Sequence, residues 1–164
     1  MSSLQDIERV LLVGIGATAV LDLWLVLLGR MGVPTLNFAF VGRWVGHLAR
    51  GRIMHAGIAR STPIRGELAL GWFTHYAIGI SFAWALLAIQ GMSWARQPTL
   101  WPCLLLGVCT VLMPLFVMQP AMGAGFASSK TATPAKNVIR SVANHAVFGL
   151  GLYLSSLLAA QWLR

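Results

Sequence analysis

Residues 10–29 read VLLVGIGATAVLDLWLVLLG, an apolar run that contains a single ionisable side chain, Asp22. An apolar helix must run for ~20 residues to cross the hydrocarbon layer of a bilayer. This stretch therefore predicts a membrane-spanning helix. An ionisable group inside such a helix is costly, so we expect Asp22 to face other helices and to mark a functional or assembly site.

Three further apolar runs of similar length follow, at about 68–90, 99–119 and 138–163. Of the 164 residues, 57% are apolar and 10% are charged, which leaves too little polar surface to cover a soluble globule. The mean hydropathy of +0.74 agrees with this reading. The sequence therefore predicts an all-α fold, an integral membrane bundle of four transmembrane helices, with 1–164 as a single membrane domain.

The basic residues are unevenly distributed about these runs. Nine of them adjoin or occupy the first and third connections: Arg30, Arg43, Arg50, Arg52, Arg60, Arg65, Lys130, Lys136 and Arg140. Three remain for the other side: Arg9, Arg96 and Arg164. Cytoplasmic loops retain positive charge, so we expect both termini to be periplasmic and the loop 31–66 to be cytoplasmic. The basic residues adjoin membrane spans instead of forming a soluble basic face, which argues against nucleic-acid binding.

The loop 31–66 is long enough to contain structure of its own. Apolar residues recur with helical spacing along 36–50, while polar residues that include Arg43 and His47 fall between them. This pattern predicts an amphipathic helix that follows Pro34, with Thr35 as its N-cap. Such a helix would lie along the cytoplasmic surface with its arginines near anionic lipid headgroups. The connection 121–137, rich in Gly, Ala, Ser and Thr, is expected to be a flexible link.

Small and polar residues recur every four positions on three of the predicted spans. The three sets are Gly14, Thr18 and Asp22; Gly71, His75, Gly79 and Ala83; and Ser141, His145, Gly149 and Tyr153. Residues four apart share one helix face, and small residues let neighbouring helices approach closely. We therefore expect Asp22, His75 and His145 to point into the bundle, ~8 to 12 Å inside its cytoplasmic ends at 1.5 Å of rise per residue.

Three interpretations of these polar residues remain open. The first is a structural hydrogen-bonded cluster, completed by Tyr76 or Asn144, that holds the helices in register. The second is a transport or proton-relay site, in which Asp22, His75 and His145 exchange a proton or bind a divalent cation such as zinc, iron or nickel. The third is a non-covalent haem b between His75 and His145, as in an electron-transfer subunit.

Catalytic signatures are absent from the sequence, which argues against an enzyme. Glu67, His47 and His55 would be the residues for an acid and base pair at the membrane surface, although such residues are more commonly solvated loop positions. Proline at position 114 is expected to loosen the third span, because it releases a carbonyl from its helical bond. Cys103 and Cys109 lie six residues apart on that span, face different directions and are expected to be reduced thiols.

Several motifs resemble those of an uncharacterised bacterial family of small integral membrane proteins, a domain of unknown function. They are Val41-Gly42-Arg43-Trp44, Gly66-Glu67 leading to His75-Tyr76, Gln119-Pro120-Ala121-Met122-Gly123, and the run from His145 to Tyr153. The resemblance extends over nearly the whole chain and implies a four-span protein of the bacterial cytoplasmic membrane. From the residues we expect a transport-related or accessory protein, or a structural assembly factor, that forms a homodimer or joins a larger membrane complex.

Overall fold

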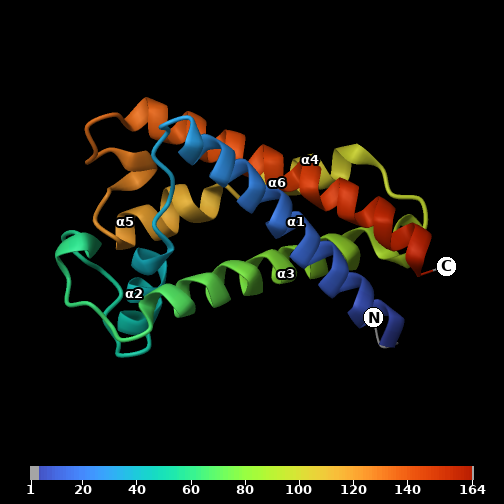
Figure 1. Cartoon of the computed structure of the whole chain (residues 1–164), viewed down its shortest axis with the longest axis horizontal. Helices are drawn as coiled ribbons and strands as arrows, with labels where there is room; N and C mark the ends of the chain where they lie inside the picture. Colours follow the sequence, from blue (N-terminus) through green and yellow to red (C-terminus); the bar gives the residue numbers. More distant parts are fainter. Residues whose placement is uncertain (1–3, 164) are drawn as a thin grey trace. The chain divides into compact units, whose positions relative to one another are not determined.

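A computed structural model describes residues 4–163, and these residues form helices and loops with no strand (Figure 1). The all-α prediction is confirmed. The α-helices are α1 (Leu4–Arg30), α2 (Phe38–Leu48), α3 (Glu67–Trp94), α4 (Leu100–Cys109), α5 (Gln119–Ala121) and α6 (Pro134–Trp162). Shorter turns are η1 (Ile58–Arg60), the π-helix η2 (Pro114–Met118) and η3 (Phe126–Ser128).

Four segments of the described chain are long and apolar enough to cross a bilayer, so the chain is a multi-span membrane protein. They are Leu4–Arg30, Glu67–Trp94, Leu100–Ala121 and Pro134–Trp162. The first begins at Leu4, well before the apolar run that starts at Val10, so the helix also includes polar residues ahead of that run. One of these polar residues, Arg9, has partners inside the protein. Its guanidinium donates to the carbonyls of Ala95 (3.1 Å) and Leu163 (2.8 Å), just beyond α3 and α6, where a cation is favourable.

The amphipathic helix of the first connection exists, but it is shorter than predicted and begins at a different cap. Helix α2 covers Phe38–Leu48, and the side chain of Asn37 accepts a hydrogen bond from the Ala39 amide at 3.0 Å. The prediction of Thr35 as the N-cap was wrong. Asn is among the strongest N-cap residues, and its extended backbone conformation (φ −85°, ψ 107°) is the one that a cap requires.

The third span is interrupted, as Pro114 led us to expect. Helix α4 ends at Cys109, and the chain continues as the π-helix η2, which begins at Pro114. The connection that follows is not the flexible link that its composition predicted. Ser128 is 2% exposed and its hydroxyl donates to the side-chain oxygen of Gln119 at 2.9 Å, which ties the loop to α5.

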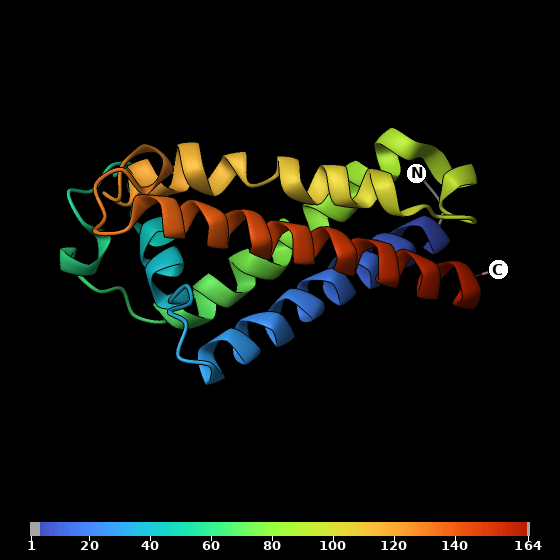
Figure 2. The ribbon, with the colours of Figure 1, turned by 90° about the horizontal axis from the view of Figure 1, so that it is seen from above.

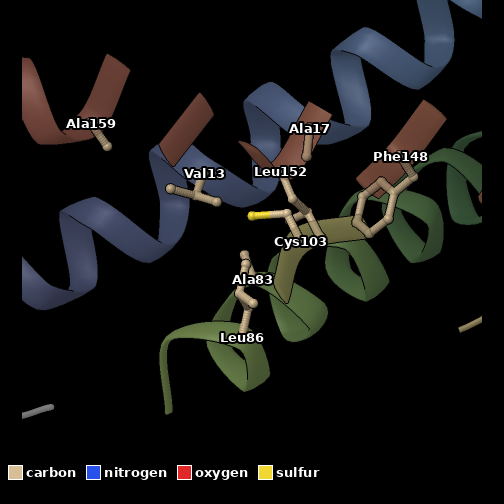
Figure 3. Close-up of a cluster of buried hydrophobic side chains, with 8 residues drawn as sticks. All are labelled: Val13, Ala17, Ala83, Leu86, Cys103, Phe148, Leu152 and Ala159. Carbon is tan, nitrogen blue, oxygen red and sulfur yellow. The ribbon is translucent and has the colours of Figure 1, made fainter. Parts of the chain in front are cut away.

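The chain forms two compact units, each assembled from separate segments. Unit 1 contains residues 1–34, 76–109 and 144–164, and unit 2 contains residues 35–75 and 110–143. Helices α3 and α6 contribute residues to both units, so a single membrane domain stays a prediction. The core of unit 1 comes from four helices (Figure 3): Val13, Ala17, Ala83, Leu86, Cys103, Phe148, Leu152 and Ala159. Cys103 and Cys109 are both free.

Small residues bring the helices of unit 1 close together. A Cβ added to Gly14 would lie 2.5 Å from Cα of Ile80, and one added to Gly79 would collide with the Thr18 hydroxyl. That hydroxyl is tied back to the Gly14 carbonyl at 2.7 Å, so it is held in this position. Helix α1 also runs beside the C-terminal half of α6 (Figure 2), with Gly151 against the Ala17 backbone. The spacing of four thus does mark packing faces.

Candidate functional site

The acid of the first span is hydrogen-bonded to a tyrosine of the second, within unit 1. The hydroxyl of Tyr76 on α3 donates to Oδ2 of Asp22 on α1 at 2.8 Å, and both residues are half-buried. Asp22 lies one turn beyond Thr18, on the α1 face that packs against α3. A hydrogen bond from a neutral donor to a carboxylate stabilises the ionised form, which otherwise has a high cost in a membrane.

A second polar contact joins α1 to α6 at nearly the same level. The indole nitrogen Nε1 of Trp24 donates to Oδ1 of Asn144 at 3.0 Å. The next residue on α6, His145, makes a side-chain hydrogen bond to the backbone of Gly107 on α4. Asp22 and His145 both belong to unit 1. Asp22 is bonded to α3, and His145 is bonded to α4.

The other membrane histidine, His75, belongs to unit 2 and lies in an aromatic cluster. Its ring centroid lies 4.5 Å from that of Phe38 on α2 and 5.9 Å from that of Trp72, one turn earlier on α3. Phe38 and Trp72 are themselves 4.3 Å apart. This packing is typical of aromatic pairs and fixes the start of α2 against α3.

The predicted three-residue centre divides between the two units. Asp22 and His145 are in unit 1, and His75 is in unit 2. Residues 4–163 contain no group of three or more His, Cys, Asp or Glu side chains arranged to hold a metal ion. A metal site at Asp22, His75 and His145 and a haem between His75 and His145 both stay predictions.

Unit 2 contains a buried ion pair that fastens α2 to the first turn of α3. The guanidinium of Arg43 donates to both carboxylate oxygens of Glu67, from Nε to Oε2 at 2.8 Å and from Nη2 to Oε1 at 2.7 Å. Glu67 Oε2 also accepts from the Ile64 amide at 2.9 Å. The side chains are 8% and 18% exposed, so the pair is largely removed from water. Bidentate pairs of this kind combine strength with fixed geometry.

Glycines permit this pair to form. An added Cβ at Gly42 would overlap the Glu67 carbonyl, and one at Gly71 would overlap the Phe38 carbonyl. Helices α2 and α3 therefore touch through their backbones at these two positions. The ion pair also places Arg43 well inside the protein, at 7% exposure, so the prediction that this arginine faces lipid headgroups was wrong.

The remaining donors of Arg43 organise the loop that follows α2. Its Nη1 lies within hydrogen-bonding distance of the carbonyls of Ile58 (3.2 Å), Ala59 (3.3 Å) and Ser61 (3.1 Å). The bond to Glu67 raises the pKa of Arg43 above its usual value, so the cation is permanent. The buried side chain of Arg43 therefore joins α2, α3 and the loop between them, and both oxygens of Glu67 are used in this pairing.

The two loop histidines lie beside this network. His47 Nε2 is bonded to the Thr62 carbonyl at 2.9 Å, and His55 Nδ1 is bonded to the Ser61 hydroxyl at 2.9 Å. Their ring centroids are 5.1 Å apart, and the residues are 7% and 5% exposed, not solvated as the sequence suggested. Burial above all, and then the charges of Arg52 and His47, lower the pKa of His55, so it is neutral near pH 7.

The sequence did not identify Ser61, Arg9 or Trp24 as partners in these networks. Arg9 and Trp24 are joined to residues far away in the chain, such as Asn144, which lies 120 positions after Trp24. A buried polar residue is informative when its type is unusual for its surroundings. Arg9 just before an apolar run was such a signal, since a charged residue there must find backbone carbonyls or water.

The arrangement contains an acid with a hydroxyl donor between two candidate spans and a basic loop before the start of α3. Among known proteins, a family described as "Protein of unknown function (DUF2938)" matches residues 11–159. No curated protein and no solved structure matches the chain.

Proposed function

The chain belongs to the DUF2938 family, whose function is unknown, and we propose that it is a transport-related or accessory membrane protein. In this proposal Asp22 exchanges a proton while it is hydrogen-bonded to Tyr76. The observation that carries this proposal is the hydrogen bond of 2.8 Å from the Tyr76 hydroxyl to Oδ2 of Asp22. It joins the acid of the first span to the second span.

A purely structural role explains the pair less well. Hydrogen bonds between membrane helices are worth only ~0.6 kcal/mol on average, whereas an Asp at the centre of a span costs ~2.5 to 3.5 kcal/mol. The packing faces of α1 and α3 already contain Gly14, Thr18 and Gly79, which make close contacts between the two helices without the acid. An acid at this position is therefore better explained by a use that needs its charge.

The chemistry available to the pair is a change of protonation. An ionised Asp22 accepts a hydrogen bond from the Tyr76 hydroxyl, while a protonated Asp22 can itself donate a hydrogen bond to the Tyr76 oxygen. Both states have a partner, so neither leaves a bare polar group in hydrocarbon. A carboxyl that is stable in both states is suited to passing a proton across part of the membrane.

Proton flux into vesicles tests the transport function. The purified full chain would be reconstituted into vesicles that contain a pH-sensitive dye, and a potassium diffusion potential would drive proton entry. We expect the wild type to acidify the interior, Asp22→Asn to remove the flux, and Tyr76→Phe to reduce it. Glu8→Gln is the matched control, because Glu8 is an exposed acid on the same helix. Flux equal to that of empty vesicles, or retained by Asp22→Asn, would overturn the proposal.

The placement in the membrane is part of the same proposal. The chain resides in the cytoplasmic membrane of a bacterium, with both termini periplasmic and the basic loops facing anionic lipid headgroups in the cytoplasm. The support is the excess of Lys and Arg in the two longer connections. Reporter fusions that are active on only one side of the membrane test this, and a cytoplasmic terminus would contradict it.

The proposed assembly is a homodimer or a larger membrane complex. Four helices leave little room between them for a transport pathway. A second copy of the chain or a partner protein would supply the rest of the lining of such a pathway. Crosslinking in native membranes followed by mass determination of the purified complex tests this. A monomer under both conditions would contradict it.

A further inference from the structure

The loop after α2 contains an open polar cavity of about 270 Å³ that the proposed proton site does not use. It is lined by Arg52, Ala56, Gly57, Arg60, Ser61 and Thr62, all in unit 2. A water molecule occupies ~30 Å³ of liquid, so the cavity has room for a phosphate group and part of the group that bears it. Both arginines are exposed, and no ion pair within residues 4–163 involves either of them.

Unit 2 has a large excess of positive charge. Its segments contain eight Lys and Arg residues and one acid, Glu67. Both oxygens of Glu67 are already occupied by Arg43 and the Ile64 amide. Arg52 and Arg60 therefore have no carboxylate of their own unit to pair with.

Several carbonyls of the segment next to the cavity are already used as acceptors. Four carbonyls of the segment 58–62 accept bonds from the interior: those of Ile58, Ala59 and Ser61 from Arg43, and that of Thr62 from His47. The lining also contains the guanidinium groups of Arg52 and Arg60. Guanidinium forks are suited to phosphate, whose oxygens accept several charged hydrogen bonds at once.

Hydrogen bonds and close packing hold the residues around the cavity. The Ser61 hydroxyl is fixed between His55 Nδ1 at 2.9 Å and the Gly57 carbonyl at 3.4 Å. His55 is 5% exposed, and its second ring nitrogen, Nε2, is buried without a hydrogen-bond partner among the described residues. The Arg60 guanidinium lies over Gly57, where an added Cβ would be 3.3 Å from Nε and 3.4 Å from Nη2.

We propose that this cavity binds a phosphate group through the guanidinium groups of Arg52 and Arg60. The source that the surroundings favour is the headgroup of an anionic phospholipid, because the loop leads directly into the start of the α3 span. The choice of lipid over soluble phosphate depends on the proposed headgroup contact of the loops, whereas the cavity itself does not. It is also independent of proton exchange at Asp22.

Binding to the purified full chain in a neutral detergent tests the cavity. Three probes separate the sources: short-chain phosphatidylglycerol, short-chain phosphatidylcholine and inorganic phosphate, each followed by native mass spectrometry and by the shift in unfolding temperature. We expect one tightly bound phosphatidylglycerol per chain. Arg52→Gln and Arg60→Gln should each weaken it about tenfold, the loss expected when a charged hydrogen bond is removed.

Two further variants keep the result interpretable. Arg65→Gln is the matched control, since Arg65 is an exposed arginine of the same loop that does not line the cavity. Gly57→Ala adds a methyl group against Arg60 without changing charge and should weaken binding as well. Preferential binding of inorganic phosphate would support the cavity and assign it to a soluble ligand.

The contrary results are equally distinct. Equal losses in Arg52→Gln, Arg60→Gln and Arg65→Gln would overturn the cavity and leave only general attraction between the basic loops and anionic lipids. Binding of none of the three probes would overturn it outright. Proteins that keep the wild-type unfolding temperature without ligand provide the evidence that a variant is folded.

Discussion

Glu67→Gln should loosen the whole loop that follows α2, because it removes the charge that Arg43 requires. Breaking a buried ion pair by removing one partner costs about 3 to 5 kcal/mol, since the other charge is left buried and uncompensated. Both side chains are well shielded, at 8% and 18% exposure, so solvent screening reduces this little. Arg43 keeps its three carbonyl partners, which places the expected loss near the lower end, about 3 kcal/mol.

Amide hydrogen exchange of the full chain in a bilayer mimetic measures this local loss. The Ile58 amide donates to the Met122 carbonyl at 2.9 Å and the Ser61 amide donates to the Ile58 carbonyl at 3.1 Å, so both report on opening of the loop. At about 1.4 kcal/mol for each factor of ten, their exchange should accelerate by roughly two orders of magnitude. Peptides from the core of α1 should keep their exchange rates.

A double-mutant cycle identifies the cause. Arg43→Gln should be as harmful as Glu67→Gln, and the combined variant should lose clearly less than the sum of the two. Arg65→Gln should change exchange little, because substitutions at exposed positions usually stay within ~0.5 kcal/mol. The reasoning is refuted if Glu67→Gln behaves like Arg65→Gln, or if the two single losses simply add.

Three other predictions concern packing, capping and pH. Gly14→Leu should lower the unfolding temperature and expose Cys103 to thiol reagents, since overpacking costs ~1 to 3 kcal/mol or more, whereas Gly29→Leu, with nothing within 4 Å of its added Cβ, should not. Asn37→Ala should increase amide exchange in the first turn of α2, with a loss of about 1 kcal/mol, and Thr35→Ala should leave it unchanged. His55, which faces His47 and Arg52, has a pKa lowered from 6.5, so the unfolded chain binds its proton more readily. Loop stability should therefore be full above pH 6.5 and fall below it. Exchange of the Ile58 amide against pH measures this, and a slope that survives His55→Gln would speak against it.

The spans were predictable because their signal is local: an apolar run of sufficient length has one solution in lipid. The packing faces were also readable, since Gly14 and Thr18 follow the helix period and do meet α3. The loop was harder. Amphipathic spacing placed Arg43 and His47 on a polar face, but it cannot distinguish a polar face turned to headgroups from one buried against a loop. Arg43 is buried because it pairs with Glu67, which lies 24 positions away in the chain.

The site within the membrane shows the same limit. Depth along each helix predicted that Asp22 would meet a partner from another span, and Tyr76 is that partner. The same reasoning grouped Asp22 with both histidines, and this grouping stays a prediction; His145 is also bonded to Gly107 and His75 is packed on Phe38. Depth fixes one coordinate of a side chain, while the rotation of each helix about its axis depends on every contact that it makes.

Infrared difference spectroscopy of the reconstituted protein during a pH titration tests proton exchange at Asp22 most directly. The account predicts a carboxyl C=O band that titrates reversibly, that is absent in Asp22→Asn, and that shifts in frequency in Tyr76→Phe because the hydroxyl donor is gone. Glu8→Gln should leave the band unchanged. A spectrum without a titrating band assigned to Asp22, or a band indifferent to Tyr76→Phe, would contradict the proposed site.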